Sequence, residues 1–112
     1  MNKSDIIIIG AGPGGYEMAV EACAKGLTVT IFEENKPGGT CLNEGCIPTK
    51  ALCRNAEVAE TVKRAAEFGI TVGGSAIEGE NAAPAVAVDF GAVQARKQAV
   101  VDQLVAGVEG LL

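Results

Sequence analysis

The chain has 112 residues and a net charge of −5, and 48% of its residues are apolar while only 4% are aromatic. This length supports one domain with one aliphatic core. The acidic balance argues against a nucleic-acid partner, which would need a basic surface. No apolar run approaches the roughly 18 residues of a membrane span, and the N-terminus lacks a secretory signal. We therefore expect a cytoplasmic protein, in which paired cysteines are more often redox or metal groups than structural disulfides.

Residues 5–33 predict a βαβ unit. The run Ile6–Ile9 is apolar and β-branched, which favours a strand buried on both faces, as in a parallel sheet. A glycine-rich turn follows, and Pro13–Lys25 then predicts a helix that ends at Gly26. Leu27–Phe32 reads as a second strand, and the crossover between the two strands should be right-handed.

A second helix is predicted over residues 38–68, after a polar loop around Pro37-Gly38-Gly39. Helix formers dominate from Cys41 onward, and we expect Pro48 to kink the helix near its start. Apolar residues recur along it at spacings of three and four: Leu52, Ala56, Ala59, Val62 and Ala66.

Residues 69–88 are rich in Gly, Ala and Val, and they predict either a linker or a small hairpin of Ile70–Val72 with Val86–Val88. A final helix is predicted over 89–112, with Asp89 as its N-cap. Its expected apolar face comprises Val93, Val100, Leu104, Val108 and Leu111.

The predicted sheet has only two strands, whereas typical sheets have four to six. The strand Ile6–Ile9 would then be an open hydrophobic edge. The simplest interpretation is an incomplete parallel sheet in a piece of a longer protein, and the alternative is a complete small domain.

The glycine turn carries the pattern Gly10-x-Gly12-x-x-Gly15 between the first strand and the first helix. The first glycine permits the turn, the second lets the backbone approach a pyrophosphate, and the third allows close helix–strand packing. Glu33 closes the next strand, where a ribose diol is usually held. The alternatives are a purely structural turn and a solvated Glu33, beside which Glu34 offers a second carboxylate.

The segment GGTCLNEGCIPTK places Cys41 and Cys46 five positions apart in a chain without histidine. On an ideal helix their Cα atoms would lie roughly 8–9 Å apart, whereas a disulfide needs about 4.4–6.8 Å. A bond therefore requires a distorted turn, which Gly45 permits, and a strained disulfide is easily reduced. A zinc site is disfavoured because the four cysteines lack the paired spacing of zinc ligands. A structural disulfide is disfavoured because the expected cytoplasmic compartment is reducing. Beside a dinucleotide turn, the pair suggests electron exchange between a disulfide and a flavin.

The segments IIIIGAGPGGYEMAV and GGTCLNEGCIPTKAL resemble the start of the flavin-dependent pyridine nucleotide–disulfide oxidoreductases. The resemblance implies an α/β fold, namely the N-terminal part of a Rossmann-like FAD-binding domain, with NAD bound by a downstream domain. The sequence of the second segment is most similar to that of family members that oxidise dihydrolipoamide to lipoamide with NAD⁺. Glutathione- or mercuric-type disulfide reductases are the alternative within the family. A non-catalytic cofactor-binding module with a redox loop is the alternative of another class.

The resemblance assigns roles to the motif residues. The three glycines of the turn would hold the FAD pyrophosphate, Glu33 the adenosine ribose, and Thr40 would lie near the cofactor. Lys50 would lie near the flavin ring, although an exposed helix lysine is the simpler interpretation without the resemblance. No residue is assigned to a metal.

The same resemblance makes Cys41 the interchange thiol that meets the substrate and Cys46 the inner thiol that contacts the flavin. Glu44 departs from the family, which commonly has an apolar residue there. A carboxylate pointing inward would raise the thiol pKa, but we expect Glu44 to face solvent.

The resemblance also accounts for the missing histidine. The family's general acid/base is a His paired with a Glu near the C-terminus, contributed across a homodimer interface. We therefore expect the parent protein to be a homodimer that serves the lipoyl domains of 2-oxo acid dehydrogenase or glycine cleavage complexes. This chain alone should not turn over.

Overall fold

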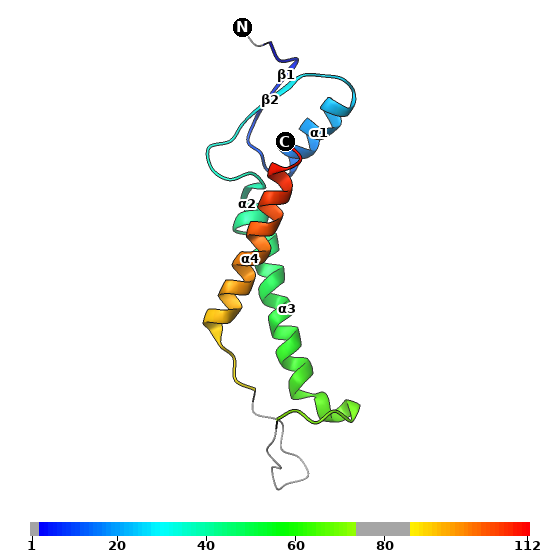
Figure 1. Ribbon diagram of the computed structural model, residues 1–112, viewed down its shortest axis with the longest axis vertical. Coiled ribbons are helices and arrows are strands. Elements are labelled where there is room, and N and C mark those ends of the chain that lie inside the picture. The colour runs from blue at the N-terminus through cyan, green and yellow to red at the C-terminus, as the bar shows by residue number, and fades with distance from the viewer. Residues whose placement is uncertain (1–2, 74–85) are drawn as a thin grey trace.

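The computed structural model describes residues 3–73 and 86–112 (Figure 1). Within these ranges the chain forms two strands, four α-helices and one 3-10 turn. In chain order they are β1 (Ile6–Ile9), α1 (Pro13–Ala24), β2 (Val29–Phe32), α2 (Gly39–Asn43), α3 (Cys46–Lys63), η1 (Ala65–Phe68) and α4 (Phe90–Glu109).

The predicted βαβ unit is confirmed. Strands β1 and β2 pair in parallel, in a register that runs from Ile6 opposite Val29 to Ile9 opposite Phe32. Helix α1 begins at Pro13, and Gly26 follows it with a left-handed φ of 84°, as expected for a glycine that ends a helix. The second strand is two residues shorter than predicted.

The expectation that β1 is buried on both faces is wrong for this chain. Ile6 and Ile8 are half-buried, whereas Ile7 is 64% and Ile9 is 88% exposed. Among the described residues the sheet contains only β1 and β2, so nothing covers the second face of β1. The expectation of an incomplete sheet with an open hydrophobic edge is confirmed.

The predicted helix over residues 38–68 is divided into α2, α3 and η1, and the break lies at Glu44 and Gly45 rather than at Pro48. Pro48 lies in the first turn of α3, where backbone nitrogens have no helical partner to lose. The helical ladder of α3 starts after it, with Thr49 N–H donating to Gly45 O at 3.1 Å. The expected kink at Pro48 is therefore wrong.

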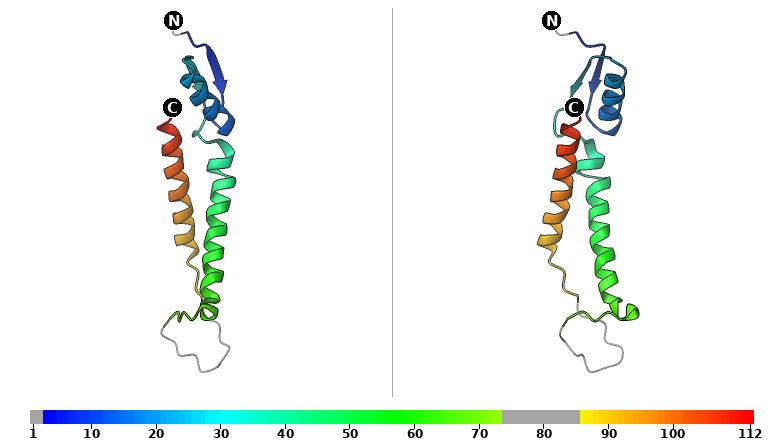
Figure 2. Two further views of the ribbon diagram at one scale, coloured as in Figure 1. Left: turned by 90° about the vertical axis from the view of Figure 1, so that its right-hand side faces the viewer. Right: turned by 45° about the vertical axis from the view of Figure 1, so that its right-hand side comes forward.

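Helices α3 and α4 run antiparallel, side by side, and form a long arm that extends from the βαβ unit (Figures 1 and 2). The molecule measures 77 × 25 × 17 Å, and its radius of gyration is 21.9 Å. A compact domain of this length would have a radius of gyration of about 13 Å.

The main apolar cluster joins α4 to α2. Leu42 packs against Val101, Val105 and Val108, and the half-buried Tyr16 and Ile47 border the cluster. The expected face of α4 is therefore only partly right: Val108 is buried, but Leu104 and Leu111 are exposed. The valines and leucines of α4 form a broad stripe, and sequence spacing alone does not select which part of that stripe packs. Asp89 is the N-cap as predicted, and its Oδ1 accepts from Ala92 N–H at 3.1 Å.

The predicted hairpin is wrong where it can be observed. Ile70–Val72 and Val86–Val88 contain no strand, and residues 74–85 of the expected linker lie outside the described residues. In the described parts of the chain, no helix is both long enough and apolar enough to cross a bilayer.

Candidate functional site

The glycine turn has the geometry that its sequence pattern predicts. Gly10 has a φ of 95°, a conformation that L side chains rarely adopt. A Cβ placed on Gly15 would collide with Gly10 O, so the helix can approach the turn only because residue 15 is glycine. Gly12 is the N-cap of α1 and leaves the helix N-terminus without a side-chain cap.

Glu33 reaches back from the end of β2 to this turn. Its Oε2 accepts from Ala11 N–H at 2.7 Å, and its Oε1 accepts from Asn35 N–H at 3.0 Å. These backbone hydrogen bonds, with that of Ala11 the larger, hold the pKa of Glu33 below its ordinary value. Glu33 is therefore an ionised carboxylate fixed at the mouth of the glycine turn.

The loop that precedes α2 packs directly on the glycine turn. Gly38 N–H donates to Ala11 O at 2.7 Å, and Gly38 and Gly39 have left-handed φ values of 103° and 63°. A Cβ on Gly39 would lie 2.8 Å from the Cα of Gly12. The sequence reasoning treated this Pro-Gly-Gly segment only as a polar loop, although consecutive glycines signal such close contacts.

Asn43 is a second residue that the sequence reasoning missed. Its Nδ2 donates to the carbonyl oxygens of Pro37 at 3.2 Å and Gly39 at 3.0 Å. These bonds close the loop onto the end of α2 and fix α2 relative to the glycine turn. An asparagine two positions after a cysteine gives no sequence signal for this role.

The two cysteines lie on either side of the break between helices. Cys41 is half-buried in α2, and Cys46 is exposed at the first position of α3; both are free thiols. A Cβ on Gly45 would lie 3.1 Å from Thr40 O and 3.4 Å from the Cα of Cys41. The absence of a side chain at Gly45 thus lets the start of α3 fold back against α2.

The Cys46 thiol influences the ionisation of Cys41. Hydrogen bonding with the Cys46 side chain, then burial and repulsion from a Cys46 thiolate, raise the pKa of Cys41. The Cys46 backbone N–H and the positive charge of Lys50 act in the opposite direction. Glu44 is exposed and does not contribute to this shift, as expected for a side chain that faces solvent.

Thr40 and Glu33 border the same polar cleft, which has a volume of about 360 Å³. The loop from Glu34 to Lys36 lines one side, and Gln98 and Val101 of α4 line the other. The structure therefore brings the predicted residues into two neighbouring groups. Glu33 and Thr40 border the cleft beside the glycine turn, and Lys50 lies with the thiol pair.

Residues 4–111 match the family described as pyridine nucleotide-disulphide oxidoreductase, so the chain belongs to this family. A solved structure of a flavoprotein has the same fold with a TM-score of 0.71 and 30% identity. It is the Cu(II) complex of the HOCl-induced flavoprotein disulfide reductase RclA from Escherichia coli. The match covers 100% of this chain and 20% of that chain. The predicted family and the predicted fold class, part of a Rossmann-like FAD-binding domain, are both confirmed.

Curated relatives of the chain are dihydrolipoyl dehydrogenases. One from Bacillus subtilis is 46% identical over 108 residues, which is 96% of this chain and 20% of that protein. One from Chlamydia muridarum is 42% identical over 113 residues, covering 100% of this chain and 22% of that protein. The chain thus spans about a fifth of the length of the curated relatives it matches.

The residues present fit the FAD that the family implies. The uncapped N-terminus of α1 offers oriented N–H groups to a pyrophosphate, and Gly10 and Gly12 have no side chains to obstruct it. The carboxylate of Glu33 stands beside this turn and can accept from ribose hydroxyls. Within residues 3–73 and 86–112, no group of three or more His, Cys, Asp or Glu side chains could hold a metal ion.

Proposed function

We propose that this chain is the flavin-side, dithiol-bearing part of a dihydrolipoyl dehydrogenase. The observation that carries the proposal is the pair Cys41 and Cys46, placed on two helices that meet beside a dinucleotide-type glycine turn. The names of its relatives support the choice of substrate. FAD, when bound, would accept two electrons from the dithiol and pass them to NAD⁺, which a further domain of the parent protein would bind.

The chain's own residues perform the disulfide exchange in this proposal. In the oxidised protein, a thiolate of dihydrolipoamide attacks the Cys41 sulfur of a Cys41–Cys46 disulfide. The bond between the two cysteine sulfurs breaks, a mixed disulfide forms at Cys41, and Cys46 leaves as a thiolate. The second lipoyl thiolate then attacks the lipoyl sulfur of that mixed disulfide, which forms lipoamide and releases the Cys41 thiolate. Two electrons pass from the substrate to the pair, and two protons leave the substrate.

The positive charge of Lys50 favours the Cys41 thiolate that this exchange releases. The sequence contains no histidine, the side chain that most often serves as a general base. We propose that the base that removes the substrate protons comes from a His–Glu pair of the partner subunit in a cytoplasmic homodimer. Lipoyl domains of 2-oxo acid dehydrogenase or glycine cleavage complexes would then be the substrate.

An assay of the full-length protein with dihydrolipoamide and NAD⁺ tests the proposal. We expect NADH formation that is lost in both Cys41→Ser and Cys46→Ser. Reduction of glutathione disulfide by a nicotinamide cofactor, without dihydrolipoamide oxidation, would contradict the substrate and favour the glutathione-type alternative. A protein that binds FAD and oxidises no dithiol would favour the non-catalytic module.

A further inference from the structure

Helix α4 contacts the elements that carry both thiols. The residue that follows Cys41 is Leu42, which is buried in the cluster with Val101, Val105 and Val108 of α4. The residue that follows Cys46 is Ile47, which packs against the same cluster. The position of each cysteine is therefore tied to α4 through its immediate neighbour in the chain.

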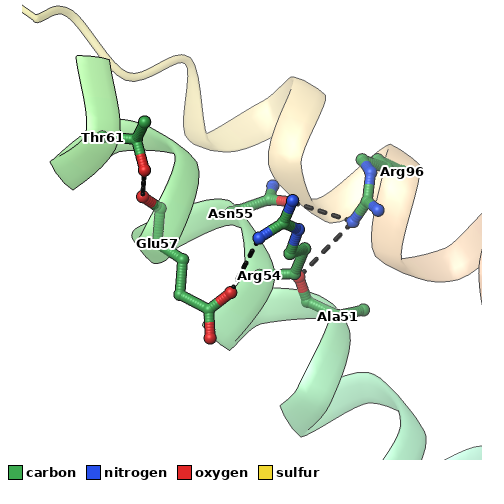
Figure 3. Close-up of polar contacts among 6 residues, drawn as sticks. All are labelled: Ala51, Arg54, Asn55, Glu57, Thr61 and Arg96. Atoms are coloured by element: carbon green, nitrogen blue, oxygen red, sulfur yellow. Dashed lines mark hydrogen bonds and ion pairs between the residues drawn. The ribbon is translucent and has the colours of Figure 1, made fainter. Parts of the chain in front are cut away.

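A second contact joins α4 to α3 further along the arm. The Nη1 of Arg96 donates to Asn55 Oδ1 at 2.9 Å and to Ala51 O at 3.4 Å, as Figure 3 shows. In residues 3–73 and 86–112 these are the hydrogen bonds by which a side chain links α3 and α4. Apolar contacts between the two helices, unlike these hydrogen bonds, carry no directional information.

Directional contacts are needed to set how far one helix lies along another. Apolar surfaces slide with little change in buried area, whereas a side-chain hydrogen bond is lost within about 1 Å of displacement. Ala51 lies one residue beyond Lys50 and little more than one turn from Cys46. Leu42 is buried in the cluster, whereas Ile47 is only half-buried at its border, so a shift of α3 along α4 would move Cys46 and Lys50 relative to Cys41.

We propose that α4 positions the thiol pair, and that Arg96 is the positioning residue that fixes α3 along α4. The inference rests on the proposed function, because it assumes that Cys41 and Cys46 interconvert between dithiol and disulfide. Arg96 touches neither thiol. It keeps the two sulfurs at high effective concentration toward each other, which favours the disulfide.

The test is a redox equilibrium of the full-length protein with mixtures of reduced and oxidised dithiothreitol. In this exchange two protein thiols lose two electrons and two protons as the cyclic dithiothreitol disulfide opens to its dithiol. Alkylation followed by mass spectrometry measures the fraction of the Cys41–Cys46 disulfide. We expect Arg96→Met to lower the equilibrium constant for the protein disulfide by about threefold to tenfold, and tenfold corresponds to about 30 mV. Arg96→Lys, which retains a donor and the charge, should recover part of the loss.

The matched control is Arg54→Met. Arg54 is exposed on α3, the helix that carries Cys46, and among the described residues it pairs with Glu57 of the same helix at 3.0 Å (Figure 3). Its loss should leave the redox equilibrium unchanged. The pH dependence of Cys41 alkylation gives a second readout. The Cys46 side chain raises the pKa of Cys41, so separation of the pair in Arg96→Met should bring that pKa down.

Two outcomes would overturn the inference, and they are distinguishable. If Arg96→Met and Arg54→Met share the redox equilibrium of the unsubstituted protein within about twofold, while Arg96→Met unfolds at a lower temperature, Arg96 is only structural. If the unsubstituted protein forms no Cys41–Cys46 disulfide at any ratio of oxidised to reduced dithiothreitol, the proposed function is wrong. The inference about Arg96 is then wrong as well.

Discussion

At the residue scale, two glycines of α1 differ in what a methyl group would meet. A Cβ on Gly15 would collide with Gly10 O, whereas one on Gly14 would meet nothing within 4 Å. We predict that Gly15→Ala lowers the free energy of unfolding by about 3 kcal/mol. Gly14→Ala should change it by no more than about 1 kcal/mol, in the stabilising direction. Urea unfolding followed by circular dichroism compares them, and equal effects would contradict the close approach of α1 to the turn.

Glu33 gives a pH prediction at the same scale. The folded pKa of Glu33 is held below its ordinary value of 4.5. Its carboxylate therefore stabilises the fold above the unfolded pKa, and this contribution is lost as pH falls through the folded pKa. Below about pH 4.5 the unsubstituted chain should lose stability more steeply than Glu33→Gln.

The control for this measurement is Glu34→Gln, because Glu34 is the exposed neighbour of Glu33. Thermal unfolding across the acid range should show the steep loss in Glu34→Gln and a shallower one in Glu33→Gln. Parallel curves for the two variants would mean that Glu33 does not hold the turn through Ala11 and Asn35.

At the scale of elements, the valines and leucines of α4 differ in burial. Val101 is 2% exposed and lies in the cluster with Leu42, whereas Leu104 is 40% exposed. We predict that Val101→Ala lowers the free energy of unfolding by roughly 2 kcal/mol, through lost burial and a residual cavity. Leu104→Ala removes a larger group and should nevertheless cost less. A greater loss for Leu104→Ala in urea unfolding would show that α4 packs through its other face.

The elements differ in how well the sequence predicts them. The βαβ unit was predictable because β-branched runs, a glycine turn and Gly26 signal the same structure independently. The break in the second helix was misplaced because Gly45 and Pro48 both carry a breaking signal. Only the packing of Gly45 against Thr40 and Cys41 decides between them.

Other parts of the site depend on tertiary contacts that no local sequence pattern signals. The bonds from Gly38 to Ala11 and from Asn43 to the loop carbonyls depend on how the loop backbone folds. The buried face of α4 depends on where α2 lies, since the valines and leucines of α4 form a stripe wider than the part that packs against Leu42. The motif residues were predictable because their chemistry is local; the contacts that hold them together were not.

At the scale of the whole molecule, the open edge of the sheet should drive association. Ile9 is 88% exposed and Phe32 is 59% exposed on a two-stranded sheet. We predict that the 112-residue chain alone forms concentration-dependent oligomers, and that Ile9→Lys reduces their mass because a charged edge resists pairing. Light scattering over a concentration series measures both effects. A monodisperse monomer would contradict the prediction.

The central claim is that Cys41 and Cys46 form a redox pair that works with a flavin. Anaerobic reductive titration of the full-length, FAD-loaded protein tests it most directly. Because a disulfide and a flavin each accept two electrons, we predict an uptake of about four electrons per FAD. The Cys41→Ser variant should take up about two. An uptake of only two electrons by the unsubstituted protein would contradict the claim.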